Sequence, residues 1–430
     1  MRKNILLVNP PIYDFSAYDF WLKPFGLLRV GGYLRKNAEL RLFDFLDRQH
    51  PFLSEKALRS DHWGRGKFLA EPVEKPEEFS TVPREYRRYG IPAQVFRDFL
   101  LTQNPFDAIL IQTNMTYWYA GVQEVLTSIR ELMPSAKTVL GGIYATLCTE
   151  HAQTLGADLV VEGCSLEGLW DLLDLEPDQS QVPYWEGYEK LSAGVLKLAD
   201  GCPFRCTYCS VPRIAPVYKP FDPDIPWNAF QFLKSLGTQN VVFYDDALLF
   251  QAEQVLEPFL RRVIEAGFNG SFHTPNALNA RFVSTEIARL ALRAGFHFFY
   301  LGFESNAISW QRKTGGKVYS EELEGAVGNL LRAGARPSQI TAYLIVGHPE
   351  TDTQEIESSM RMVHSLGIRI MLSEYSPIPG TPDGEKCRKW CDLDRPLLHN
   401  KTFFTISRLG SNRLQKLKDL CSKLNSDILL

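Results

Sequence analysis

Short apolar runs alternate with amphipathic segments along the first 170 residues. The apolar runs that predict strands are residues 4–8, 40–44, 107–112, 137–140 and 158–161. Segments such as 27–35 and 121–132 lie between these runs and have helical length and a helical period of apolar positions. Strands and helices that alternate in this way predict a doubly wound, Rossmann-like parallel sheet over residues 1–176. Ligands of such sheets bind beyond the carboxyl ends of the strands.

Two stretches break this alternation. Residues 50–104 hold five prolines and show no sustained period, so we expect an insertion there. Residues 177–190 are rich in proline, acidic residues and glutamine, which is typical of a linker between domains.

A second pattern begins at residue 191, in which a helix ends at a glycine and an apolar strand follows. The glycines are Gly237, Gly267, Gly295, Gly334 and Gly367. Glycine just past a helix supplies the left-handed cap that turns the chain into the next strand. The predicted strands are residues 195–199, 240–244, 271–274, 296–301, 341–346 and 368–373. The pattern predicts a partial (β/α)6 barrel over residues 191–382, with chemistry at the strand carboxyl ends, and a short helical extension over residues 383–430.

Composition and charge narrow the function classes. The chain has 47 basic and 50 acidic residues, a net charge of −3, which is typical of a globular protein and argues against a nucleic-acid partner. The apolar run of residues 5–8 is too short for a signal peptide, and no run is long enough to predict a membrane span. Eight cysteines are too few for a secreted disulfide scaffold of this length. We therefore expect a cytoplasmic protein.

Three of the cysteines, Cys202, Cys206 and Cys209, follow the first predicted barrel strand. Thiolates at this spacing can bind three irons of a [4Fe-4S] cluster and leave the fourth iron open to a small molecule. A zinc site is the alternative, but it needs a fourth ligand, and no second cysteine or histidine pair follows closely.

The loop resembles the signature of the radical S-adenosylmethionine (SAM) superfamily, Cys-x-x-x-Cys-x-aromatic-Cys, with Tyr208 in the aromatic place. The resemblance implies an enzyme in which SAM binds the open iron. An electron from the cluster then cleaves SAM to methionine and a 5′-deoxyadenosyl radical, which attacks a small-molecule substrate. It also implies an external electron donor such as flavodoxin or ferredoxin. No membrane partner is expected, and nucleic acid is not favoured.

The other strand ends agree with the family's SAM-binding positions. Asp245 and Asp246 follow the second strand and suit the methionine amino group, although a helix N-cap explains them almost as well. Asn276 and Glu304 follow the next two strands and would face the cofactor, where a carboxylate can accept hydrogen bonds from ribose hydroxyls. The fifth strand end resembles the family element near the adenine through Ile345, Gly347 and Glu350. His348 in this segment could be a general acid or base, but a lone histidine is more often structural.

A doubly wound domain ahead of such a barrel resembles the cobalamin-binding branch of the superfamily. The residues at strand carboxyl ends that would contact cobalamin are Asn9, Pro10, Gly141, Gly142, Ile143, Glu162 and Gly163. Ordinary glycine-rich turns are the alternative for any one of these loops. The Asp-x-His-x-x-Gly motif, whose histidine ligates cobalt in many cobalamin proteins, is absent. Bound cobalamin would imply methyl transfer to an unactivated carbon or phosphorus, whereas without it a radical rearrangement or cyclisation is expected.

Two other functions stay open. One is a non-catalytic protein that keeps a cluster or zinc as a structural or sensing element. The other is an RNA-modifying enzyme related to the tRNA methylthiotransferases, which would need an RNA-binding module after the barrel. The basic residues Lys416, Lys418 and Lys423 fit one solvated helix face better than a nucleic-acid platform.

Overall fold

A computed structural model describes residues 2–56, 58–178 and 181–428, which form two compact units. The first unit comprises Met1–Gly194, Asn228–Thr238 and Asp394–Asn400, and the second comprises Val195–Trp227, Gln239–Leu393 and Lys401–Leu430. Residue 57 of the predicted insertion, residues 179–180 of the predicted linker, and the terminal residues 1 and 429–430 lie outside the described residues.

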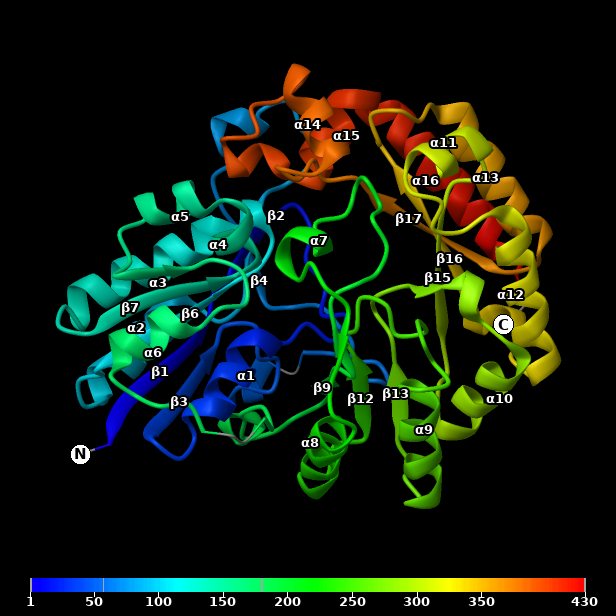
Figure 1. Ribbon diagram of the computed structural model, residues 1–430. Coiled ribbons are helices and arrows are strands. Elements are labelled where there is room, and N and C mark those ends of the chain that lie inside the picture. The colour runs from blue at the N-terminus through cyan, green and yellow to red at the C-terminus, as the bar shows by residue number, and fades with distance from the viewer. Residues whose placement is uncertain (1, 57, 179–180, 429–430) are drawn as a thin grey trace. The chain divides into compact units, whose positions relative to one another are not determined.

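The first unit is built on a five-stranded parallel sheet in the order β3-β1-β6-β7-β8. The strands β1, β3, β6 and β7 are labelled in Figure 1. The strands of the sheet are β1 (Lys3–Asn9), β3 (Ala38–Asp44), β6 (Ala108–Thr113), β7 (Lys137–Gly142) and β8 (Leu159–Val161). Each overlaps a predicted strand, so the doubly wound sheet is confirmed. The strand order places β6 at the centre between β1 and β7, where both faces of the sheet are covered.

The period of two along β1 sends alternate side chains into two cores. Leu6 and Val8 lie in one core with α2 (Ala93–Thr102), α3 (Tyr119–Leu132), α4 (Ile143–Leu147) and α5 (Thr149–Thr154). Ile5 and Leu7 lie in the other with α1 (Phe25–Leu34) and α6 (Glu167–Leu173). These apolar side chains drive the layering, because the central strands bury both of their faces.

The predicted insertion is more ordered than its sequence suggests. An antiparallel sheet in the order β2-β5-β4 forms from β2 (Ile12–Asp14), β5 (Arg87–Tyr89) and β4 (Ala70–Pro72). Helix α2 also lies inside residues 50–104, and its Phe96 and Leu100 are buried in the core of the main sheet. The structure therefore differs from the expectation of one irregular stretch. With the partly buried Val95 and Phe99, these residues form an apolar stripe at helical spacing, a local signal that the sequence analysis did not use.

The second unit holds the strands of the partial barrel in two sheets. One has the order β13-β12-β9, and the other has the order β14-β15-β16-β17. The strands are β9 (Gly194–Leu196), β12 (Asn240–Phe243), β13 (Ser271–His273), β14 (Leu278–Asn279), β15 (Phe299–Glu304), β16 (Ile340–Val346) and β17 (Arg369–Glu374). A parallel bridge between Phe272 and Phe296 links the two sheets. This order confirms the partial barrel.

Helices alternate with these strands and are labelled in Figure 1. They are α7 (Val211–Ile214), α8 (Asp224–Ser235), α9 (Leu256–Glu265), α10 (Thr285–Ala294), α11 (Ile308–Lys313), α12 (Ser320–Ala333) and α13 (Thr353–Ser365). The five predicted capping glycines all have positive φ, as at Gly295 (107°) and Gly334 (105°). The helical extension is confirmed as α14 (Pro382–Glu385), α15 (Lys401–Leu409) and α16 (Ser411–Ser426), with α16 packed on α13 and β17. Within the described residues, none of the helices has the length and apolarity that a membrane crossing requires.

Candidate cluster and cofactor site

The three-cysteine loop begins at a turn that only glycine can make. It follows β10 (Ala199–Asp200), which pairs antiparallel with β11 (Lys219–Pro220). Gly201 has φ of 75°, and a Cβ at this position would lie 2.2 Å from the Val217 carbonyl oxygen. The turn therefore sends the chain directly from the strand end into the loop.

The loop is held in shape by its own hydrogen bonds. The Arg205 guanidinium donates to the Cys202 carbonyl oxygen at 3.1 Å and to the Pro216 carbonyl oxygen at 2.8 Å. The backbone N–H of Cys209 donates to the Cys206 carbonyl oxygen at 3.1 Å. All three cysteines are free thiols, with Cys206 buried and the other two partly exposed. Three free thiols thus lie on one preorganised loop.

A lysine that the sequence analysis did not identify lies beside this loop. The Lys317 Nζ is 3.4 Å from Glu304 Oε1. Burial raises the pKa of each of the three thiols, that of Cys209 to about 11, and the positive charge of Lys317 opposes this rise. Lys317 therefore favours the thiolate forms that bind metal.

The sequence carries a signal for this lysine in the pair of glycines that precedes it. Gly315 has φ of 107°, and a Cβ there would lie 3.1 Å from the Arg205 carbonyl oxygen. A glycine is needed because the backbone passes so close to the cysteine loop. The Gly-Gly-Lys sequence thus indicates the segment in which Lys317 lies beside the cysteine loop.

The donor set fits an iron–sulfur cluster. Among the described residues, no three His, Cys, Asp or Glu side chains converge as ligands of a single metal ion would. A cubane does not require convergence on one point, because each thiolate binds a different iron. The three thiols and the adjacent cation therefore suit a cluster better than a mononuclear zinc site, which needs four convergent ligands.

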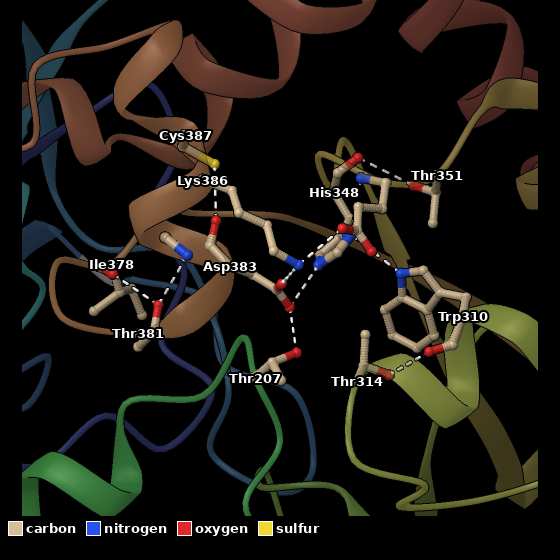
Figure 2. Close-up of polar contacts among 12 residues, drawn as sticks. Thr207, Trp310, Thr314, His348, Thr351, Ile378, Thr381, Asp383, Lys386 and Cys387 are labelled. Atoms are coloured by element: carbon tan, nitrogen blue, oxygen red, sulfur yellow. Dashed lines mark hydrogen bonds and ion pairs between the residues drawn. The ribbon is translucent and has the colours of Figure 1, made fainter.

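The aromatic residue of the loop is held by a second side chain network. The Tyr208 ring stacks on Trp310, with ring centroids 5.7 Å apart and an interplanar angle of 17°. Trp310 Nε1 donates to His348 Nδ1 at 3.1 Å, and the backbone N–H of Glu350 donates to the same nitrogen at 3.2 Å. Since Nδ1 accepts two hydrogen bonds, the proton of neutral His348 lies on Nε2. That nitrogen is 3.1 Å from Asp383 Oδ2, so it donates to the carboxylate (Figure 2).

Asp383 is a fully buried carboxylate at the centre of this network (Figure 2). It accepts hydrogen bonds from the Thr207 hydroxyl, from His348 and from Lys386 Nζ, the last at 2.8 Å. Burial acts to raise the pKa of Asp383, but these donors outweigh it and hold the pKa well below the usual range. Sequence reasoning missed Asp383, because nothing in the charged segment after the barrel distinguishes it from its exposed neighbours.

The first two predicted SAM-binding residues are engaged by the protein itself. Asp245 Oδ1 accepts from the backbone N–H groups of Leu198 and Ala199 at 2.9 and 2.8 Å. Burial raises the pKa of Asp245 to about 7. Asp246 lies 3.4 Å from Lys197 Nζ. Both aspartates therefore brace the end of the strand that leads into the cysteine loop.

The remaining predicted SAM-binding residues lie at the carboxyl ends of their strands or in the loops that follow them. Asn276 Nδ2 donates to the Tyr244 carbonyl oxygen at 3.1 Å, which ties together the segments after β12 and β13. Glu304 ends β15 in the left-handed region, with φ of 72°. Ile345 is buried on β16, and Gly347 has φ of 86°. Glu350 is exposed and lies 2.8 Å from Lys386 Nζ.

The predicted cobalamin residues lie along one edge of the first unit's sheet. Asn9 and Pro10 are buried, and Asn9 Nδ2 donates to Asp44 Oδ1 at 2.7 Å. Gly141 and Gly142 end β7, and a Cβ on Gly142 would lie 2.3 Å from the Thr113 carbonyl oxygen. The other members are Ile143 at the start of α4, the exposed Glu162, and Gly163, where a Cβ would meet no atom within 4 Å. The structure thus groups the carboxyl ends of β1, β7 and β8, where such sheets bind ligands.

Comparison with known proteins finds a family model that matches part of the barrel. The model of the radical SAM superfamily matches residues 196–363. The chain is similar to threonylcarbamoyladenosine tRNA methylthiotransferase MtaB of Thermotoga maritima, with 23% identity over 286 residues that cover 61% of this chain and 64% of MtaB. It is 22% identical to an uncharacterized methyltransferase of Pyrococcus horikoshii over 44% of this chain and 40% of that protein. The chain therefore spans less than two thirds of the length of either relative.

Solved structures match a longer part of the chain. TsrM from Kitasatospora setae, a radical SAM methyltransferase with cobalamin and a [4Fe-4S] cluster bound, superposes with a TM-score of 0.68 and 15% identity over 98% of this chain and 91% of TsrM. The cobalamin-dependent SAM radical enzyme OxsB superposes with a TM-score of 0.57 and 14% identity over 94% of this chain and 56% of OxsB. These matches show that both units have the fold of cobalamin-dependent radical SAM proteins.

Proposed function

Because residues 196–363 match the model of the radical SAM superfamily, we propose that the chain cleaves SAM reductively at a [4Fe-4S] cluster. Cys202, Cys206 and Cys209 would hold the cluster. The observation that carries this proposal is the preorganised loop with three free thiols at the end of the first barrel strand. In partial barrels of this kind, chemistry belongs at the strand carboxyl ends.

The cluster, when bound, supplies the electron that divides SAM into methionine and a 5′-deoxyadenosyl radical. The chain's own residues prepare this site. Lys317 offsets the negative charge of the thiolates, and Glu304 offers a carboxylate that can accept hydrogen bonds from ribose hydroxyls. Asp245, Asp246, Asn276, Ile345, Gly347 and Glu350 complete the proposed SAM-binding set. Their positions at or after strand carboxyl ends support this assignment.

We further propose that the first unit binds cobalamin at the sheet edge formed by Asn9, Pro10, Gly141, Gly142, Ile143, Glu162 and Gly163. Cobalamin, when bound, supplies a methyl carrier. The shared fold with TsrM and OxsB supports this proposal, as do the glycines that let a loop approach a large planar ligand. The activity would then be methyl transfer to an unactivated carbon or phosphorus of a small molecule.

Electrons would come from an external donor such as flavodoxin or ferredoxin, because the reaction consumes an electron that no residue of the chain supplies.

A cytoplasmic location belongs to the same proposal. All eight cysteines are free thiols, which suits a reducing compartment.

RNA modification is the second candidate function, and the similarity to a tRNA methylthiotransferase favours it. The structure of α16 supports the small-molecule proposal instead. Lys418 on this helix pairs with Glu374 of β17, and the buried face of α16 packs on the barrel. Ion pairing withdraws this lysine from the exposed positive surface that RNA binding requires.

Anaerobic reconstitution with iron and sulfide, followed by dithionite and SAM, tests the proposal. We expect about four irons and four sulfides per chain, formation of 5′-deoxyadenosine, and loss of both in a Cys206→Ser variant. One zinc per chain and no iron would favour the structural alternative. Protein made with cobalamin supplied should carry a corrinoid, and its absence would remove the methyl-transfer part. Modification of added tRNA would replace the small-molecule proposal.

A further inference from the structure

We propose that Asp383 is a positioning residue for the cysteine loop, which it reaches from beyond the barrel through Thr207 and His348. This inference rests on the proposed function, since it concerns the loop that would hold the cluster. Asp383 lies in α14, 176 residues after Thr207 along the chain, yet it contacts that loop twice. Its carboxylate accepts from the Thr207 hydroxyl, and its backbone N–H donates to the Thr207 carbonyl oxygen at 3.1 Å.

The contacts close a ring that includes two adjacent residues of the loop. Thr207 bonds to Asp383, which accepts from His348, which in turn accepts from Trp310. Trp310 stacks on Tyr208, the neighbour of Thr207. Both residues between Cys206 and Cys209 are therefore held, one by hydrogen bonds and one by ring stacking. Movement of the loop would have to break contacts from α11, from α14 and from the segment that follows β16.

A further hydrogen bond joins Thr207 to Thr314, at the end of α11. The backbone N–H of Thr207 donates to the Thr314 carbonyl oxygen at 3.2 Å. The Thr314 hydroxyl donates to the Trp310 carbonyl oxygen at 2.9 Å, so the same turn of chain holds Thr207 and carries the indole. The backbone N–H, the backbone carbonyl and the hydroxyl of Thr207 thus all form hydrogen bonds.

The direction of the hydrogen bonds requires an acceptor at position 383. Trp310 and the Glu350 N–H both donate to His348 Nδ1, which leaves Nε2 as the donor. An amide NH2 facing His348 would place two donors opposite each other, and the ring cannot change tautomer without losing both bonds at Nδ1. Turning that NH2 the other way would set it against the Lys386 ammonium. A carboxylate accepts from all three groups, whereas asparagine cannot.

The position of Asp383 is itself fixed by the short helix that carries it. The Thr381 hydroxyl accepts from the Gly384 N–H at 3.1 Å and donates to the Ile378 carbonyl oxygen at 2.7 Å (Figure 2). A Cβ on Gly384 would lie 1.9 Å from that same carbonyl oxygen, so the turn packs too closely for a larger residue. The carboxylate is therefore presented from a rigid turn rather than from a flexible segment.

The experiment compares cluster retention in reconstituted Thr207→Val, Thr207→Ser and Asp383→Asn variants of the full chain. Thr207→Val keeps the shape but removes the hydroxyl, and Thr207→Ser keeps the hydroxyl. We expect Thr207→Val and Asp383→Asn to lose the cluster to an iron chelator roughly tenfold faster than the wild type, as for a lost hydrogen bond to a charged group. Thr207→Ser should match the wild type. Loss is followed by visible absorbance and by iron content.

Asp352→Ala is the matched control for general destabilisation. Asp352 caps α13 in the same unit by accepting from the Glu355 N–H at 2.9 Å, and it has no contact with the loop. We expect it to lower the thermal midpoint of the cluster-free protein without changing cluster loss. Equal loss rates for Thr207→Val and the wild type, or equal acceleration in Asp352→Ala, would overturn the inference even if Asp383→Asn fails to fold. A wild-type chain that takes up no iron would instead defeat the proposed function, and this inference with it.

Discussion

The Lys317 ammonium lies 3.4 Å from the Glu304 carboxylate, next to the cysteine loop. Its positive charge opposes the rise in thiol pKa that burial causes at Cys202, Cys206 and Cys209. The two side chains come from different elements, Glu304 from the end of β15 and Lys317 from the segment after the glycine pair that precedes α12. The Lys317 ammonium therefore lies between the three thiols, proposed as cluster ligands, and the carboxylate proposed to bind ribose.

Replacing Lys317 by methionine should make the reconstituted cluster harder to reduce. A nearby positive charge stabilises the more negative, reduced form of a cluster, so its removal shifts the midpoint potential to more negative values. Lys317→Arg keeps the charge and should shift the potential much less. A potentiometric titration followed by electron paramagnetic resonance measures the difference. Equal potentials in the Met and Arg variants would show that the charge does not act on the cluster.

The backbone conformation of Glu304 should lower the stability of the protein, while its carboxylate is needed for SAM cleavage. Its φ of 72° is a left-handed conformation that costs a residue with a Cβ about 1 kcal/mol relative to glycine. The ladder between β15 and β16 shifts register between Gly302 and Glu304, just where the carboxylate is presented. Glu304→Gly and Glu304→Ala both remove the carboxylate, but only glycine relieves the backbone.

We expect both Glu304 variants to lose SAM cleavage, and the glycine variant to be more stable than the alanine variant by about 1 kcal/mol. Thermal unfolding of the cluster-free proteins and 5′-deoxyadenosine formation provide the two measurements. An alanine variant as stable as the glycine variant would show that the conformation at position 304 is not strained.

The architecture could be predicted from the sequence because its signals are local. Alternating apolar runs identified the five strands of the first sheet, and capping glycines such as Gly295 and Gly334 identified the helix ends of the barrel. Helix α2 carries a local signal of the same kind in Val95, Phe96, Phe99 and Leu100, which all pack on the core. We expected an irregular insertion there because of the prolines in residues 50–104.

Residues of the candidate site could be predicted only where they lie close together along the sequence. Cys202, Cys206 and Cys209 lie within one loop, so their spacing carries the information. Lys317 and Asp383 lie 108 and 174 residues after Cys209 in the sequence. The glycine pair before Lys317 indicates a close backbone approach without identifying the loop that it approaches, and no local pattern marks Asp383. The domain boundaries, the individual SAM contacts and the cobalamin contacts stay predictions.

Alanine substitutions at Gly201 and Gly334 separate two effects, the steric clash of a Cβ at the cysteine loop and the strain of a positive φ. Both have positive φ, 75° and 105°, so alanine should cost each about 1 kcal/mol of unfolding free energy. At Gly334 a Cβ meets no atom within 4 Å, whereas at Gly201 it would lie 2.2 Å from the Val217 carbonyl oxygen. Gly201→Ala should therefore also displace the loop and lower the iron content after reconstitution. Full iron content in Gly201→Ala would contradict this interpretation.

In the first unit, Asp47 should make stability depend on pH. This carboxyl is 8% exposed and borders a cavity of about 230 Å³ with Asp44, His50 and Tyr188. Burial raises the pKa of Asp47 to about 6, Asp44 adds to the rise, and Lys23 opposes it. Because the folded-state pKa lies above the unfolded value of about 3.9, the contribution of Asp47 to stability is complete below pH 4 and is lost as the pH rises through 6.

Asp47→Asn should therefore stabilise the protein above pH 6 by roughly 2–3 kcal/mol and should have little effect near pH 4. Asparagine can still accept the hydrogen bond that Asp47 receives from the Gln49 N–H at 2.9 Å, so the substitution removes mainly the charge.

Asp158 in the same unit provides a control of opposite sign. Burial acts to raise its pKa, but hydrogen bonds from the Thr138 N–H and from Lys137 outweigh this and lower it. Asp158→Asn should therefore destabilise the protein at neutral pH, and this loss should shrink as the pH falls. Thermal midpoints of both variants and the wild type between pH 4.5 and 8 test the pair, and parallel pH curves for Asp47→Asn and the wild type would show that Asp47 ionises normally.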